Sequence, residues 1–445
     1  MVWGLRQSAI RGWSLWQRKM ATSFMPSSEL LPVLQGKAPE ILSAAVCGDG
    51  LSADPASPVL VFPAKPPDAR KAKTCVIALN RPKQLNALTA DMCTTMRSIV
   101  KDRIVPYAST TDKDVFDCAV LVGSGDKSFC AGGDVKHVCI EAFVNGRPKA
   151  ATGFFEAEYA MNFDLSALPA GKTIVSLLDG IVMGGGAGIS MHGKFRVATE
   201  RSMFAMPECG IGFMPDVGAT FVLPRIPHRF GYYLGLSGER IDGSAMLSCG
   251  VATHFVESRR LGDLCEALLS LPSDSGETEG VSEALIEETL SSFEPSTAKE
   301  IRKHANAPEN SEQGCAHLRG RAWIPTVFAP EHRNMASIFA ALERAAESSE
   351  SAQATLNKMR NLNSPRSMQI TLEALARGAS MPNLQSCLAM ETLLAQRACQ
   401  PDSFDFYEGV RAALIDKDKS PQWRPELSER ALHDLFMPIM PTSHL

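Results

Sequence analysis

Two glycine clusters stand where a peptide backbone could hold a negatively charged oxygen. The first occupies residues 129–134 (FCAGGD) and the second occupies residues 183–188 (MGGGAG). Glycine permits left-handed backbone conformations and lets a ligand approach the main chain closely. If one N–H group from each cluster faced the same point, the pair would form an oxyanion hole for a carbonyl that becomes anionic. Each cluster alone is equally compatible with a tight, closely packed turn.

Two acidic residues that lie close to each other in the sequence follow the second cluster. Glu208 comes directly after Pro207, and Asp216 opens the tripeptide DVG. A positioned carboxylate can act as a general base or as a nucleophile. Neighbouring carboxylates in an apolar cleft also raise the pKa of one of them, which helps a base work near neutral pH. The structural alternatives are a carboxylate at a helix start for Glu208 and an N-cap for Asp216.

The elements that must position these residues follow from short apolar runs and from helical spacing. Runs that predict buried strands lie at residues 75–79, 118–122, 174–178 and 195–198. Helices are predicted between them, over residues 89–103 and from about residue 186 to residue 193. Strands that alternate with helices predict an α/β fold with crossover connections.

The pattern changes after about residue 263, where only helical periodicity remains. The predicted helices there cover residues 264–271, 282–293, 335–346, 352–359, 365–378 and 383–399. We therefore divide the chain into four parts. They are a leader (1–28), a linker or lead-in rich in Pro, Ala and Ser (29–70), an α/β core (71–263) and a mainly helical C-terminal region (264–445).

Composition excludes several classes of partner. The formal net charge is −4, so no global basic field attracts nucleic acid. The most apolar run, residues 173–191, contains Asp179 and several glycines and does not resemble a membrane-spanning helix. Neither the 9 histidines nor the 12 cysteines show zinc-binding spacing, and no CxxC pair occurs. We expect reduced, mostly buried cysteines and no metal site.

The two ends carry different targeting signals. Residues 1–28 contain four basic residues, no acidic residue and apolar residues between the charges, which is typical of a mitochondrial transit peptide. A disordered tail is the alternative interpretation. The C-terminal residues Ser443, His444 and Leu445 are a variant of the peroxisomal Ser-Lys-Leu signal. We place the mitochondrion first and keep the peroxisome as the alternative.

Four segments together resemble a known superfamily. Residues 79–88 (LNRPKQLNAL), the two glycine clusters and the Pro207-Glu208 pair resemble, in this order, the signatures of the crotonase (enoyl-CoA hydratase) superfamily. The resemblance implies a crotonase core, a ClpP-like ββα spiral, that binds acyl-CoA. It also implies that the backbone N–H groups of Gly133 and Gly185 form the oxyanion hole.

The carboxylates indicate the branch of that superfamily. The hydratases carry a glutamate two residues after the GGG turn, where this chain has Gly188. Glu208 with Asp216 instead resembles the 3-hydroxyisobutyryl-CoA hydrolase family, as do residues 195–208, 250–256 and 406–425. By this resemblance Glu208 and Asp216 are catalytic.

The same resemblance assigns the substrate contacts. Glu158, Gly185, Glu208 and Asp216 match the family's substrate-binding positions, although the spacing from Glu158 to the GGG turn is slightly longer than in the family. After Asp216 the chain also departs from the family, because it reads GATF (218–221) where more glycine is usual. This departure could reshape the wall of the acyl pocket.

The resemblance implies hydrolysis of a short 3-hydroxyacyl-CoA thioester, with 3-hydroxyisobutyryl-CoA as the best single candidate, in valine breakdown. CoA is part of that substrate, so we expect no separate cofactor, no nucleic acid partner and no membrane partner. A homo-oligomer is compatible with the family, since many crotonases are trimeric. Two alternatives remain, a crotonase-type hydratase or isomerase and a non-catalytic crotonase-like subunit. Gly188 argues against the first, and Glu208 with Asp216 argues against the second.

Overall fold

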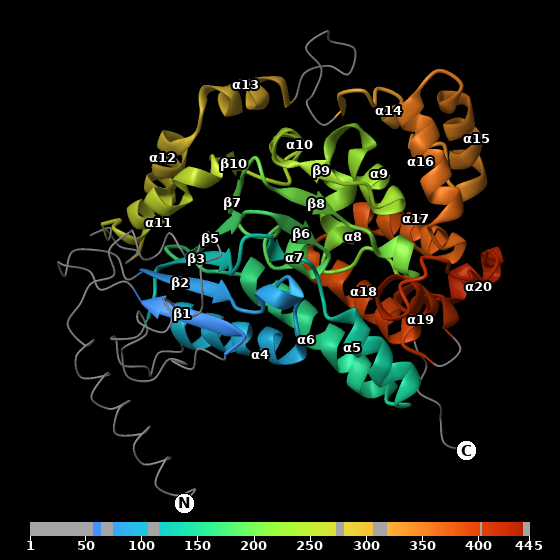
Figure 1. Cartoon of the computed structure of the whole chain (residues 1–445), viewed down its shortest axis with the longest axis horizontal. Helices are drawn as coiled ribbons and strands as arrows, with labels where there is room; N and C mark the ends of the chain where they lie inside the picture. Colours follow the sequence, from blue (N-terminus) through green and yellow to red (C-terminus); the bar gives the residue numbers. More distant parts are fainter. Residues whose placement is uncertain are drawn as a thin grey trace, which may run out of the picture.

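The computed structural model describes residues 57–63, 74–105, 115–272, 280–305, 318–400 and 403–438. The expected leader, most of the expected linker and the C-terminal tripeptide lie outside the described residues. Figure 1 shows strands in the middle of the molecule, with helices around them and the late helices gathered on one side. In the described part of the chain, no helix has both the length and the apolar character that a bilayer crossing requires.

A six-stranded sheet forms the centre of the fold. Five of its strands run parallel, and the edge strand β1 is antiparallel to β2. In sheet order the strands are β1 (Val59–Pro63), β2 (Thr74–Leu79), β3 (Cys118–Gly123), β5 (Thr173–Leu178), β7 (Phe195–Ala198) and β10 (His254–Phe255). The four predicted strands are confirmed. Their continuous apolar runs reflect burial on both faces, as parallel sheets require.

Strand β1 lies within the segment expected to be a linker, and for its residues that expectation is wrong. It pairs along its whole length with β2, from Val59 opposite Leu79 to Pro63 opposite Cys75. Its alternating side chains enter two different apolar clusters, one on each face of the sheet. Proline is tolerated at the end of an edge strand, which is where Pro63 lies. The prolines near this strand therefore made its residues resemble a linker in the sequence.

A second, smaller sheet carries both glycine clusters. Its strands, in order, are β4 (Ser128–Cys130), β6 (Ile181–Met183), β8 (Met203–Ala205) and β9 (Ile241–Asp242). Strands β4 and β6 are parallel neighbours, and each leads directly into one glycine cluster. Segments that leave parallel neighbours at the same end emerge side by side. The fold thereby brings together two clusters that are about fifty residues apart in the sequence.

Helices cover both faces of the large sheet. On one face lie α4 (Ala90–Ile99) and α6 (Pro148–Ser166), and on the other α11 (Leu261–Leu269) and α12 (Glu283–Phe293). The helix predicted over residues 89–103 is α4 followed by a π-helical turn, Val100–Ile104. The helix predicted after the GGG turn is shorter than expected, because α7 covers only Gly185–Gly188.

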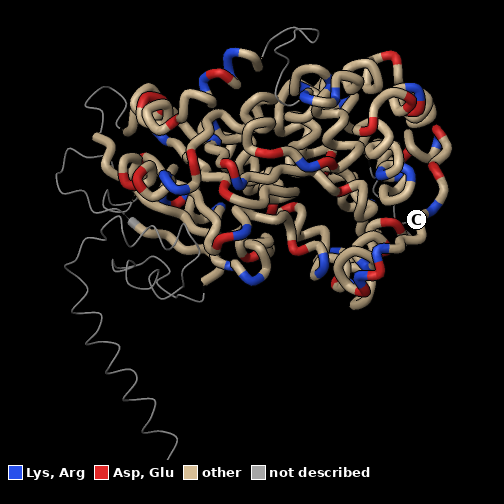
Figure 2. The backbone as a smooth tube through the Cα atoms, turned by 45° about the horizontal axis from the view of Figure 1, so that its top comes forward, with Lys and Arg blue, Asp and Glu red and all other residues tan. Residues whose placement is uncertain are grey.

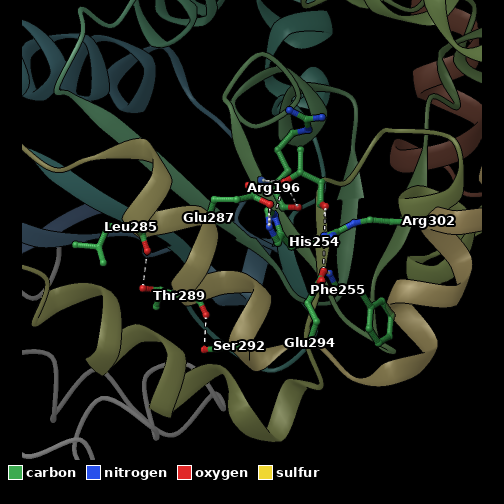
Figure 3. A network of polar contacts seen from close by, with 10 residues as sticks. Arg196, His254, Phe255, Leu285, Glu287, Thr289, Ser292, Glu294 and Arg302 are labelled. Atoms are coloured by element: carbon green, nitrogen blue, oxygen red, sulfur yellow. Dashed lines mark hydrogen bonds and ion pairs between the residues drawn. The ribbon is translucent and has the colours of Figure 1, made fainter.

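A polar network attaches the first helices of the C-terminal region to the edge of the sheet (Figure 3). His254 of β10 lies 3.1 Å from Glu287 of α12, and Arg302 of α13 (Ser296–Ala305) donates to the carbonyl oxygen of Thr253 and pairs with buried Glu294. Glu294 also accepts from the backbone N–H of Phe255. This network lies on β10, α12 and α13, away from the strands that carry the glycine clusters.

The later helices pack onto the core. The helices predicted there are confirmed as α15 (Met335–Ala346), α16 (Glu350–Asn361), α17 (Pro365–Ser380) and α18 (Leu384–Ala398). Helix α17 packs against α8 (Ala219–Val222) and α9 (Phe230–Ser237), and α18 packs against α6. Their apolar residues belong to the same continuous cluster as β2 and α4. The C-terminal region is thus built into the core.

Candidate active site

The first glycine turn is held by residues 79–88, the segment that precedes it in the family resemblance. Leu88 donates its N–H to the carbonyl oxygen of Gly132 and accepts from the N–H of Asp134, both at 2.8 Å. The side-chain amide of buried Asn86 donates to the carbonyl oxygens of Ser124 and Ser128. These bonds fix the backbone on both sides of Gly133, so its own N–H has a defined direction.

The two predicted amides are neighbours in space. A Cβ atom placed on Gly185 would lie 3.2 Å from the nitrogen of Gly133. Gly185 is the first residue of α7, and Gly184 before it has φ of 48°, a left-handed conformation that favours glycine. Neither Gly133 nor Gly185 donates its N–H to another described residue. Two adjacent, unused backbone donors are what an oxyanion hole requires.

The three predicted carboxyl groups are shielded from solvent, and two of them lie beside the glycine turns. Glu158 lies on α6, Glu208 begins the short 3-10 helix η5 (Glu208–Ile211), and Asp216 precedes α8; their exposed fractions are 2%, 6% and 5%. A Cβ on Gly185 would overlap Oε1 of Glu158, and one on Gly184 would lie 3.0 Å from Oε1 of Glu208. The structure therefore brings all five predicted residues together.

Two of these carboxyl groups are incompletely hydrogen-bonded. Oε1 of Glu158 and Oε2 of Glu208 are buried and have no partner among the described residues. Buried polar atoms nearly always have a hydrogen-bond partner, and exceptions concentrate where a ligand or water binds. The unpaired oxygens therefore mark the places where substrate or water would be held.

Burial and mutual repulsion control the ionisation of the trio. Burial raises the pKa of Glu158 and of Glu208 well above the ordinary value, and the nearby charge of Asp216 raises both further. Burial raises the pKa of Asp216 to about 7, against the hydroxyl of Tyr159, which donates to it at 2.6 Å and favours the ionised form. A proton can therefore be held within this trio near neutral pH.

The position of the missing hydratase glutamate is physically blocked. A Cβ atom on Gly188 would lie 2.6 Å from Cβ of Val217 and 2.9 Å from Nδ2 of Asn162. Real Cβ atoms do not approach other carbons this closely, so no side chain fits at residue 188 without displacement of its neighbours. Val217 follows Asp216 directly, and the loop that presents Asp216 fills the place of that glutamate.

Sequence reasoning missed three polar residues of the site. Tyr159 bonds Asp216, Asn162 is fully buried with both amide atoms unpartnered among the described residues, and Glu391 binds the loop after Asp216. Asn162 could have been found from its spacing, because position i+4 from Glu158 lies on the same face of a helix. Tyr159 directly follows Glu158, and this spacing gives no such signal. Glu391 has no local signal, since only tertiary packing brings α18 to the site.

A basic residue of the segment 79–88 is engaged within the protein. Arg81 pairs with Asp134 at 3.1 Å and donates to the carbonyl oxygen of Ala87. Each of the 10 described cysteines is buried and unpaired. Among the described residues, no group of three or more His, Cys, Asp or Glu side chains is arranged so that it could hold a metal ion. Figure 2 shows basic and acidic residues interspersed along the described chain.

Comparisons with known proteins show the family of this chain. The family model "Enoyl-CoA hydratase/isomerase" matches residues 74–436. The mitochondrial 3-hydroxyisobutyryl-CoA hydrolase of Dictyostelium discoideum is 36% identical over 380 residues, which cover 83% of this chain and 91% of that protein. The human protein of the same name is 37% identical over 372 residues, which cover 82% and 87%.

Solved structures show the same fold. A carnitinyl-CoA dehydratase from Mycobacterium thermoresistibile matches with a TM-score of 0.67 and 30% identity over 83% of this chain and 95% of that one. An enoyl-CoA hydratase from Rhodobacter sphaeroides matches with a TM-score of 0.62 and 30% identity over 86% and 98%. The crotonase fold is thus confirmed. The chain belongs to the enoyl-CoA hydratase/isomerase family and, within it, to the 3-hydroxyisobutyryl-CoA hydrolases.

Proposed function

We propose that this protein hydrolyses a short 3-hydroxyacyl-CoA thioester, with 3-hydroxyisobutyryl-CoA as substrate and 3-hydroxyisobutyrate and CoA as products. The observation that carries the proposal is the proximity of two unused amides, from Gly133 and Gly185, to a cluster of three buried carboxyl groups. The relatives named above supply the identity of the acyl group. From the family resemblance, we propose that the reaction belongs to valine breakdown.

The amides act on the thioester carbonyl. When water or a carboxylate attacks the carbonyl carbon, the oxygen becomes anionic and the N–H groups of Gly133 and Gly185 receive it. One such donor is worth about 3 kcal/mol of transition-state stabilisation. Both donors belong to the backbone of turns fixed by β4 and β6, so the hole needs little reorganisation during the reaction.

The carboxyl groups supply and remove protons. Glu208 takes a proton from the attacking water, the C–S bond breaks, and the CoA sulfur leaves with a proton returned from the carboxyl trio. In the alternative route, Glu208 itself attacks to give a mixed anhydride that water then opens. Asp216 orients the water and shares the proton, while Glu158 contacts the substrate.

A comparison of two substrates tests this function. The purified full-length chain is given 3-hydroxyisobutyryl-CoA or crotonyl-CoA, and both free thiol and enoyl absorbance are followed. We expect thiol release from the first substrate and no loss of absorbance from the second, because residue 188 cannot carry the second hydratase carboxylate. Hydration of crotonyl-CoA without thiol release would overturn the proposal.

The acyl preference can be tested with related substrates. One methyl group changes specificity by only about 1–3 kcal/mol, so a panel of branched and straight 3-hydroxyacyl-CoA thioesters is needed.

We propose a mitochondrial location, supported by the names of the relatives and by the basic, acid-free residues 1–28. A fluorescent fusion in which residues 1–28 are deleted should lose mitochondrial signal; peroxisomal signal that depends on residues 443–445 would favour the alternative.

A further inference from the structure

The loop that presents Asp216 has a backbone conformation that needs external support. Val217 has φ of 54° and Gly218 has φ of 84°, so two consecutive residues are left-handed. A β-branched residue such as valine rarely adopts this conformation. Strained backbone of this kind persists only where the surrounding structure fixes it, and such sites cluster at functional positions.

That support comes from a buried glutamate on the C-terminal helix α18. Glu391 is fully buried, and its Oε2 accepts the N–H of Gly218 at 2.7 Å. Its Oε1 accepts both the N–H of Thr220 at 3.0 Å and the hydroxyl of Thr220 at 2.6 Å. Both carboxylate oxygens are thus committed to the four residues after Asp216, and the donors stabilise the ionised form.

A second contact holds the loop from the side of α7. Nε2 of His192 lies 2.7 Å from the carbonyl oxygen of Val217, so this nitrogen carries the hydrogen and donates it. Burial lowers the pKa of His192 to about 4, so the imidazole is neutral near pH 7. A Cβ on Gly218 would collide with this imidazole ring and lie 2.6 Å from Cδ1 of Leu384. The loop is therefore fixed between α18 and the segment after α7.

We propose that Glu391 is a positioning residue for the thioester hydrolysis. It fixes the loop of residues 216–220 so that the Asp216 carboxyl faces Tyr159 and Glu208. This inference rests on the role proposed for Asp216 above. It also gives the C-terminal helical region a part in the reaction, because α18 reaches a loop of the α/β core from far along the sequence.

Charged and titratable groups surround Asp216 on several elements. The groups that face it are Glu158 and Tyr159 on α6, Glu208 in η5 and Glu391 on α18. Burial and the nearby charge of Asp216 raise the pKa of Glu391 to about 8, against the hydrogen bonds from Thr220 and Gly218. The proposed role therefore rests on the hydrogen bonds of Glu391 to the loop and not on a charge at this residue.

The decisive variant is Glu391→Gln in the full-length protein. The new amide can still accept from Thr220, but its NH₂ group meets the N–H of Gly218, so one half of the clamp is lost. We expect kcat for 3-hydroxyisobutyryl-CoA to fall about 10- to 100-fold, because small misplacements of catalytic groups have effects of this size. KM should change by less than about threefold, since the CoA-binding surface is untouched.

Two further variants are compared with Glu391→Gln, one as a second test and one as a control. Thr220→Val removes one hydroxyl donor, keeps both backbone donors and should lower kcat about threefold. Glu373→Gln removes a carboxylate of α17 that is paired with Arg377 near the surface, and it should leave kcat and the pH profile unchanged. Thermal melting of each variant separates loss of fold from loss of turnover.

The possible results separate the two proposals. A folded Glu391→Gln protein with unchanged kcat would overturn the positioning role. Should that variant fail to fold, unchanged kcat in Thr220→Val would overturn it instead. Full activity in Asp216→Asn would remove the proposed role of Asp216 itself. An inactive Asp216→Asn beside a fully active Glu391→Gln would refute only the clamp.

Discussion

The two halves of the site are built in different ways. The amides of Gly133 and Gly185 belong to turns that follow neighbouring strands, and local hydrogen bonds from residues 79–88 fix the first turn. The carboxyl groups of Glu158, Glu208 and Asp216 come from separate elements, and the Asp216 loop depends on α18 from the C-terminal region. The amide half is thus formed by the α/β core, whereas the carboxyl half also depends on the C-terminal helical region.

The largest expected effect is in the carboxyl half. Glu208→Gln removes the group proposed to accept the proton of water and should lower kcat about 10²- to 10⁴-fold, the range for loss of a general base. Binding of a non-hydrolysable analogue that keeps the carbonyl, with CH₂ in place of sulfur, should persist, since the amide half is intact. Turnover by thiol release and binding by calorimetry measure the two halves separately. Normal turnover would show that the base is another residue.

The amide half should be nearly as sensitive. In Gly185→Ala the new Cβ would overlap Oε1 of Glu158 and lie 3.1 Å from Cδ1 of Leu88, so the turn must shift. We expect kcat to fall about 10²- to 10³-fold, the cost of losing one oxyanion donor. Gly153→Ala is the matched control, because a Cβ there meets nothing within 4 Å. Equal activity in the two variants would refute the assigned donor.

A subtler change tests the electrostatics of the carboxyl half. Tyr159→Phe removes the hydrogen bond that favours ionised Asp216, so the pKa of Asp216 should rise. If ionised Asp216 is required, activity is present above this pKa and lost as pH falls through it. The acid limb of kcat should therefore move to higher pH, with roughly a 3- to 10-fold loss at pH 7. An unshifted limb would mean that another group governs it.

The smallest effect on turnover is expected far from both halves. Arg302→Ala leaves Glu294 buried with less compensation in the network of Figure 3. We expect a loss of about 1–3 kcal/mol in the free energy of unfolding and no change in kcat per folded molecule. Arg259→Ala, which breaks an exposed pair with Glu257, is the control and should be nearly neutral. Denaturant melts and active-site titration measure the two quantities.

The sequence predicted the amide half better than the carboxyl half for a physical reason. Glycine clusters after apolar strands encode backbone geometry locally, so both clusters could be found from the residues alone. Gly133 and Gly185 within them, like Glu208 and Asp216, were named by family resemblance. The structure places Glu208 beside the glycine turn and Asp216 near Glu208. Their catalytic roles stay predictions until the variants above are measured.

Contacts between distant segments could not be predicted. Nothing near Glu391 indicates that both its oxygens bind residues 218 and 220, because that contact depends on how α18 packs. The departure from the family at residues 218–221 looked like a change in the acyl pocket, yet Thr220 is committed to Glu391. Strand β1 was missed because prolines obscured a run whose burial depends on β2.

The crowding at Gly188 bears on how activities diverge within this family. A single substitution that restored a glutamate there would drive its side chain into Val217 and Asn162. Val217 is covalently joined to Asp216, so a backbone movement that made room would also displace the acid to which we assign a role in thioester cleavage. We therefore expect that evolution from this protein towards alkene hydration needs changes at several positions, and that a single substitution at residue 188 is not sufficient.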